Sequence, residues 1–196
     1  MGLRVLQQMN YLDIVIVILG IRICYIAAKT GIAVEFFKLL GVLSSIYIAS
    51  HYYTAFSDSF QQRFLHQSVP LEFIDFIVFI LLVIAVYLGF VLLRSTFYRF
   101  MKMEAAPELN KFGGLILGLL RVYFTIGLLV YALMISSVHY LSSSVAHSYI
   151  GSRFSYVSAQ TYNWVWGSVF SKFFPQEKLN SVVGEARDNL KKNEVN

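Results

Sequence analysis

The chain has 196 residues, of which 57% are hydrophobic and 14% charged, and its formal net charge is +5. Soluble domains usually carry about 25% charged residues, so this composition excludes an ordinary water-soluble enzyme. An aromatic content of 16% excludes a disordered chain, and a single cysteine excludes a disulfide-stabilised fold.

Four apolar runs are each long enough to cross a bilayer as a helix, which takes about 20 residues. They cover residues 11–28, 31–50, 73–93 and 112–138. The runs are continuous rather than alternating, which argues against a membrane β-barrel, and helices satisfy their own backbone hydrogen bonds in lipid. We therefore predict an all-α polytopic membrane protein, with a four-helix transmembrane bundle over residues 1–138.

The first run follows Arg4, as a secretory signal peptide would, but Asp13 and Arg22 interrupt it and no small-residue cleavage site follows. We therefore expect a retained span. Asp13 and Asp75 both lie in the first turns of spans that start on the same side of the membrane. Their placement suits a positive helix end, and the alternative is a proton or cation site that faces the bundle.

Charged residues also occur inside the second and fourth runs. Arg121 lies about 13 Å into the fourth run at 1.5 Å per residue, where a charge is costly unless it is compensated. Glu35 enters the second run from the same side, so we predict a Glu35–Arg121 ion pair; the alternative is that Arg121 snorkels to the headgroups. Glu35 and Lys38 are three residues apart and could also pair, but we favour a solvated first helical turn for them.

Small residues recur at helical spacing along three of the runs. Such stripes let helices approach closely, and we expect them to pack the helices of the bundle, with dimerisation as the alternative. The candidate packing residues are Gly20, Gly31, Gly41, Gly113, Gly114 and Gly118.

Basic residues near the spans predict the orientation of the bundle. One side has seven of them: Arg22, Lys29, Lys38, Arg94, Arg99, Lys102 and Lys111. The other side has two, Arg4 and Arg63. The richer side is expected in the cytoplasm, which places both termini in the periplasm, and its charges would attract anionic lipid.

After the fourth run the chain becomes rich in serine. Apolar residues then recur at helical spacing, and Trp164 and Trp166 are typical membrane-interface anchors. We therefore predict a Ser-rich segment and a C-terminal interfacial amphipathic helix over 139–175, with a fifth span over 152–174 as the alternative. The charged residues 176–196 are expected to form a mobile tail.

The sequence contains no recognisable catalytic or metal site. The four histidines are scattered, and the serines at 142–144 have no nearby base and acid. His51 stands beside Tyr52 and Tyr53, which we interpret as interfacial anchors. No enzymatic activity, cofactor, metal or nucleic acid is expected.

One set of residues resembles a known family. Asp13, Gly31 and Glu35 occur in order in the first hairpin, and the fourth span opens with LNKFGGLILGLLR over 109–121. From about residue 10 to 138 the chain resembles the colicin V production protein family of bacterial inner-membrane proteins. In that family the fourth span begins Asp-Arg-x-x-Gly-x-x-x-Gly-x-x-Arg-Gly. Gly114, Gly118 and Arg121 fill this pattern, and the chain departs from the family at Thr30, Asn110, Lys111 and Val122.

The resemblance implies a multi-pass inner-membrane protein that supports production or export of colicin V, a bacteriocin toxin, and envelope homeostasis. We expect it to act without catalysis, through helix contacts with secretion or envelope proteins or with a second copy of itself. The alternative is a small ion- or proton-coupled channel or transporter that uses Glu35, Arg121 and Asp75.

Overall fold

The computed structural model describes residues 10–65, 69–100, 107–136, 138–174 and 176–185. In these ranges the regular elements are helical and there is no strand. The elements are α2 (Tyr11–Thr30), α3 (Ile32–Phe60), η1 (Gln61–Leu65), α4 (Leu71–Phe100), α5 (Pro107–Met134), α6 (His139–Ala146), α7 (Tyr149–Phe154), α8 (Val157–Val165), η2 (Trp166–Phe170) and α9 (Ser171–Phe173).

Four of these helices are long and apolar enough to cross a membrane. They contain the segments Tyr11–Thr30, Ile32–Arg63, Leu71–Phe97 and Glu108–Met134. The predicted all-α fold with four membrane-length helices is confirmed, and its composition is that of a membrane protein.

The helix boundaries differ from the apolar runs. α3 continues past residue 50 to Phe60, and α4 continues past residue 93 to Phe100. α5 begins at Pro107 instead of 112 and ends at Met134 instead of 138. An apolar run marks only the apolar part of a helix. The helix itself continues through polar residues until a capping or helix-breaking residue ends it. Proline suits the first helical position because its φ is already helical and it has no N–H to leave unpaired.

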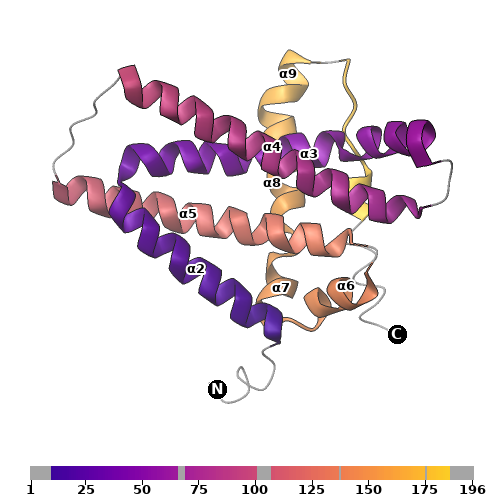
Figure 1. Cartoon of the computed structure of the whole chain (residues 1–196), viewed down its shortest axis with the longest axis horizontal. Helices are drawn as coiled ribbons and strands as arrows, with labels where there is room; N and C mark the ends of the chain where they lie inside the picture. Colours follow the sequence, from indigo (N-terminus) through magenta and orange to yellow (C-terminus); the bar gives the residue numbers. More distant parts are fainter. Residues whose placement is uncertain (1–9, 66–68, 101–106, 137, 175, 186–196) are drawn as a thin grey trace.

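The long helices alternate in direction and pack as neighbours (Figure 1). α4 runs antiparallel to α3, and α2 runs antiparallel to α5, while α3 and α5 lie side by side at the centre. One end of the bundle therefore holds the α2–α3 turn, the end of α4 and the start of α5, and is called here the Gly31 end. α4 packs mainly against α3, so most of its surface is left exposed.

Gly31 and Gly114 illustrate why close approaches in the bundle require glycine. Gly31 joins α2 to α3 with φ of 80°, and a side chain there would also collide with the Asn110 amide. At Gly114 an added Cβ would lie 2.8 Å from the carbonyl oxygen of Ala27 on α2. The other candidate packing glycines also face helices of the same chain: Gly20 faces Val122, Gly41 faces Phe90, Gly113 faces Ile32 and Gly118 faces Ala27.

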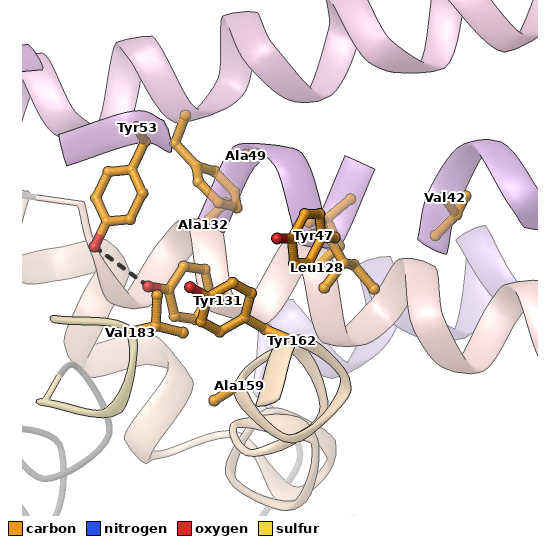
Figure 2. Packing of buried hydrophobic residues seen from close by; sticks show 12 residues of the cluster. Val42, Tyr47, Ala49, Tyr53, Leu128, Tyr131, Ala132, Ala159, Tyr162 and Val183 are labelled. Carbon is orange, nitrogen blue, oxygen red and sulfur yellow. Dashed lines mark hydrogen bonds between the residues drawn. The ribbon is translucent and has the colours of Figure 1, made fainter. Parts of the chain in front are cut away.

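A cluster of buried tyrosines forms the core at the end of the bundle opposite Gly31 (Figure 2). The hydroxyl groups of Tyr53 on α3 and Tyr131 on α5 lie 3.3 Å apart, and Tyr162 of α8 packs in the same cluster. The interpretation of Tyr53 as an interfacial anchor is therefore wrong, because its side chain points into the bundle and only Tyr52 is exposed.

The chain after α5 runs across the long helices rather than beside them (Figure 1). It is broken into several short helices instead of one amphipathic helix. Val157, Ala159 and Tyr162 face the bundle. Trp164, which is 68% exposed, and Phe173 point outward. The turn at Ser155–Tyr156 and the wider π-helical coil of η2 change the side-chain period, so the expected single apolar face does not form.

Part of the predicted mobile tail is packed. Val183 is buried in the tyrosine cluster, and the Asn180 amide donates a 2.9 Å hydrogen bond to the Ser50 carbonyl. Residues 176–185 therefore contact the bundle through Asn180, Val183 and the charged Glu177, which lies 3.3 Å from His51. The mobile tail over 176–196 stays a prediction. Residues 186–196 lie outside the described residues.

We predict that Gly114→Ala destabilises the bundle, because its methyl group would meet backbone atoms of α2 that cannot rotate away. The expected loss is about 1–3 kcal/mol, seen as a fall of about 5 °C in the melting temperature of the purified protein. The control is Gly89→Ala on α4, where an added Cβ meets nothing within 4 Å. Equal melting temperatures for the two variants would contradict the close approach of α2 and α5.

Candidate functional site

The ion pair predicted between the second and fourth membrane-length helices is present in the structure. Nε of Arg121 on α5 donates a 2.8 Å hydrogen bond to Oε2 of Glu35 on α3. Nη2 of Arg121 lies 2.7 Å from the same oxygen but is not aligned for a hydrogen bond. Glu35 is 0% exposed and Arg121 is 7% exposed, so Arg121 does not snorkel to a surface.

The second carboxylate oxygen of Glu35 is also occupied. Nζ of Lys38 lies 2.6 Å from Oε1, and the Thr30 hydroxyl donates to the same oxygen at 2.7 Å. The interpretation of Glu35 and Lys38 as a solvated first turn is therefore wrong. Thr30, which departs from the family pattern, supplies a hydrogen bond that spacing alone could not reveal.

Asn110 fixes the backbone beside this cluster. Its Oδ1 accepts a 2.8 Å hydrogen bond from the backbone N–H of Ile32, the first residue of α3. The N-terminal N–H groups of a helix have no partner within the helix, and Gly31 has no side chain to cap them. Asn110 of α5 therefore caps α3 from outside. The amide oxygen is an acceptor like the carboxylate of the family pattern, so this departure keeps the chemistry.

The cluster is deeper in α5 than the sequence suggested. Because α5 begins at Pro107, Arg121 lies about 21 Å along the helix from its start instead of the expected 13 Å. Two cations and one carboxylate leave Glu35, Lys38 and Arg121 with a formal charge of +1. Burial of ionised groups costs several kcal/mol each, and such groups are tolerated when their charges and hydrogen bonds are met, as they are for Glu35.

Asp13 forms a second buried carboxylate site at the other end of the bundle. Its Oδ2 accepts from the N–H groups of Asn10 at 2.8 Å and Tyr149 at 3.1 Å. Its Oδ1 accepts from the Ser148 hydroxyl at 2.6 Å and the Ile150 N–H at 2.7 Å. Asp13 thus caps the N-termini of both α2 and α7. The sequence predicted that Asp13 lies at the positive end of α2. It did not predict the hydrogen bond from Ser148 or the capping of α7.

Asp75 is not brought together with the Glu35 cluster. It lies beside Ser57 of α3, and one of its carboxylate oxygens is buried without a hydrogen-bond partner among the described residues. Glu35 and Ser57 are separated by about 33 Å along α3 at 1.5 Å per residue. The residues of the channel hypothesis are therefore divided: Glu35 and Arg121 pair toward the Gly31 end of the bundle, and Asp75 lies toward the opposite end.

His51 and Trp166 join α3 to the crosswise segment. His51 Nδ1 lies 2.9 Å from the Tyr162 hydroxyl, and His51 Nε2 lies 3.3 Å from Glu177 Oε2. Burial raises the pKa of Tyr162, whose hydroxyl also accepts a 2.9 Å hydrogen bond from the Asn180 N–H. The Trp166 ring stacks over His51 at 5.4 Å, which makes Trp166 a packing residue, while the exposed Trp164 keeps the geometry of an anchor.

Within residues 10–65, 69–100, 107–136, 138–174 and 176–185 there is no group of three His, Cys, Asp or Glu side chains that could hold a metal ion. Glu35 and Asp13 are the buried carboxylates among the described residues. The oxygens of both accept from donors of the chain itself.

The comparisons with known proteins give one match. A model of the colicin V production protein family matches residues 12–176, which include the crosswise helices as well as the four long ones. No curated protein and no solved structure matches significantly.

We predict that Glu35→Gln destabilises the protein more than Arg121→Gln. Removing the carboxylate leaves two buried cations without an anion, whereas removing Arg121 leaves Glu35 paired with Lys38. Breaking a buried pair costs about 3–5 kcal/mol, which should lower the melting temperature by about 10 °C for Glu35→Gln.

A double-mutant cycle tests the pairing itself. The Glu35→Gln and Arg121→Gln double variant should lose less stability than the sum of the two single losses, because neither partner remains to be left alone. Lys29→Gln, an exposed cation of the same end, is the control for loss of charge. Strictly additive losses would show that the two side chains do not interact.

We also predict that Asp13→Asn destabilises the attachment of α7 to α2. The asparagine amide would direct its own donors at N–H groups that need acceptors, with an expected loss of about 2–4 kcal/mol by thermal unfolding. Asp58→Asn, at an exposed position of α3, is the matched control. If both variants melted like the unchanged protein, Asp13 would not be the cap of the two helices.

Proposed function

Because the chain belongs to the colicin V production protein family, a membership that supports a role in colicin V production, we propose that it is a non-enzymatic scaffold of the bacterial inner membrane. It crosses the membrane four times and acts through helix contacts with secretion or envelope proteins, so that loss of these contacts impairs both toxin production and envelope homeostasis.

The proposed orientation follows from the basic residues. Lys29, Lys38, Arg94 and Lys111 all lie toward the Gly31 end of the bundle, and Lys and Arg concentrate on cytoplasmic faces. This end is therefore cytoplasmic. An even number of crossings then places both termini, together with the crosswise helices, on the periplasmic side.

The observation that carries the scaffold proposal is the contrast between inner and outer surfaces. Inside, the carboxylates of Glu35 and Asp13 take their donors from the chain itself. Outside, α4 is the most apolar of the membrane-length helices. Only 6% of the residues in its most apolar 18-residue stretch are buried. Its exposed face includes Ile77, Leu81, Ile84, Leu88 and Leu92. Such a face suits a partner helix.

The separation of Asp75 from Glu35 disfavours the channel or transporter alternative. A transport site collects polar side chains near the bilayer midplane. Between Glu35 and Ser57, the residue beside Asp75, α3 instead contributes buried apolar residues to the core: Leu39, Val42, Ile46 and Ala49. This packing supports a scaffold, which needs a stable interior and an available outer face.

Bulky apolar substitutions test the α4 face without disturbing membrane insertion. In a colicin V-producing strain whose own copy is deleted, Leu88→Trp should lower secreted toxin by about tenfold relative to the unchanged chain, as expected for a loss of about 1.4 kcal/mol in partner affinity. Ile21→Trp on α2, which is also exposed in the membrane-length part of the bundle, should leave secretion unchanged.

Two further results would overturn this proposal. Normal secretion by Leu88→Trp, at an unchanged protein level, would remove the α4 face from the function. Proton or ion flux through liposomes that contain only the purified protein, abolished by Asp75→Asn, would favour the transporter. A photo-crosslinking residue at position 88 should capture an envelope protein or a second copy of the chain.

A further inference from the structure

Residues 176–185, called here the strap, contact the bundle through side chains of different chemistry. Val183 is an apolar contact in the tyrosine cluster, as Figure 2 shows, and Asn180 donates neutral hydrogen bonds to α3 and α8. The carboxylate of Glu177 lies 3.3 Å from Nε2 of His51 on α3. Histidine is the side chain whose charge ordinarily changes between about pH 5 and 8, so the strength of this last contact depends on pH.

The surroundings of His51 suit a protonated imidazole. Its side chain is 8% exposed, and burial alone would disfavour a charge. Two aromatic rings lie nearly parallel to the imidazole: Tyr47 of α3 at 5.6 Å and the uncharged Trp166 of η2 at 5.4 Å. The faces of aromatic rings attract a cation. These rings and the Glu177 carboxylate therefore offset the loss of water around the charge.

Both imidazole nitrogens have partners in either charge state. Nδ1 of His51 lies 2.9 Å from the Tyr162 hydroxyl, which also accepts from the Asn180 N–H. A hydroxyl has one donor and two lone pairs, so it serves a neutral Nδ1 as a donor and a protonated Nδ1 as an acceptor. Nε2 faces the Glu177 carboxylate, which accepts from it. A protonated His51 thus leaves neither of its N–H groups without an acceptor.

We propose that His51 holds the strap on the bundle in a pH-dependent manner. Protonation of His51 places a full positive charge against Glu177, so the attached strap is favoured in mild acid. Loss of that proton leaves a contact between a neutral ring and a carboxylate, and the strap then detaches more often. Attachment is therefore tightest near pH 5.5 and weakens toward about pH 8. This inference does not depend on the scaffold proposal.

The other groups around His51 keep their charge over this interval. Among the described residues, the titratable groups that face it are Tyr47 and Tyr52 of α3, Tyr162 of α8 and Glu177 of the strap. Tyrosine hydroxyls ordinarily ionise near pH 10 and carboxylates below about pH 5. Tyr52 also donates a 3.5 Å hydrogen bond to the second oxygen of Glu177. A change in strap attachment between these limits is thus assigned to His51.

Thiol labelling of the purified full-length protein measures how often the strap opens. In a Cys24→Ser background, Val183→Cys places a thiol at a position that is 1% exposed, and Val182→Cys places one at the exposed neighbouring position. Dividing the first maleimide rate by the second removes the pH dependence of thiol reactivity. The ratio should rise about threefold from about pH 5.5 to pH 8, as expected for a partly exposed ion pair.

Variants of the strap separate the ion pair from general charge. Glu177→Gln removes the carboxylate at a 39% exposed position, so the bundle stays intact and the rise of the ratio should disappear. Glu185→Gln removes an exposed carboxylate of the same strap and should keep the full rise. His51→Gln should also abolish the rise, and its melting temperature shows whether the bundle remains folded.

The inference is overturned if the ratio is the same at both pH values, or if Glu177→Gln keeps the rise. Equal loss of the rise in Glu177→Gln and Glu185→Gln would assign it to the overall charge of the strap instead. A rise accompanied by a matching fall in the melting temperature of the whole protein would mean unfolding of the bundle, and would equally reject a local contact.

Discussion

A carboxylate with no solvent contact must find its donors within the protein, and this requirement organises the Gly31 end of the bundle. Glu35 draws donors from three helices: Thr30 from α2, Lys38 from its own helix and Arg121 from α5. Asn110 adds a cap to the first turn of α3. The α2–α3 turn and the start of α5 are thereby held together, and the glycines of α2 and α5 can approach because no side chain intervenes.

The opposite end is held by the same kind of interaction with different donors. Asp13 takes its hydrogen bonds from backbone N–H groups and a serine rather than from cations. The two sites therefore differ in kind. The Asp13 site neutralises the positive ends of two helices, whereas the Glu35 site keeps a net positive charge, which is continued on the surface by Arg94.

This distribution of polarity bears on what the protein can do. The buried carboxylates of Glu35 and Asp13 are occupied in joining helices, whereas the apolar side chains of α4 largely remain exposed. A protein built in this way offers its environment the apolar face of α4. Such a face is consistent with a supporting role in toxin production.

The amino-acid sequence determined the number and type of the long helices, because apolar runs of bilayer length depend only on neighbouring residues. It also predicted the Glu35–Arg121 pair, since both charges lie in runs that enter from the same side, but it left open that Arg121 snorkels to the headgroups. The tertiary structure alone decided that Lys38 and Thr30 share the carboxylate, that Asn110 caps α3, that Ser148 joins Asp13, and that Asn180 and Val183 attach the tail. These contacts depend on which backbone and side-chain groups come within about 3 Å once the helices have packed, and no spacing along the chain encodes that distance.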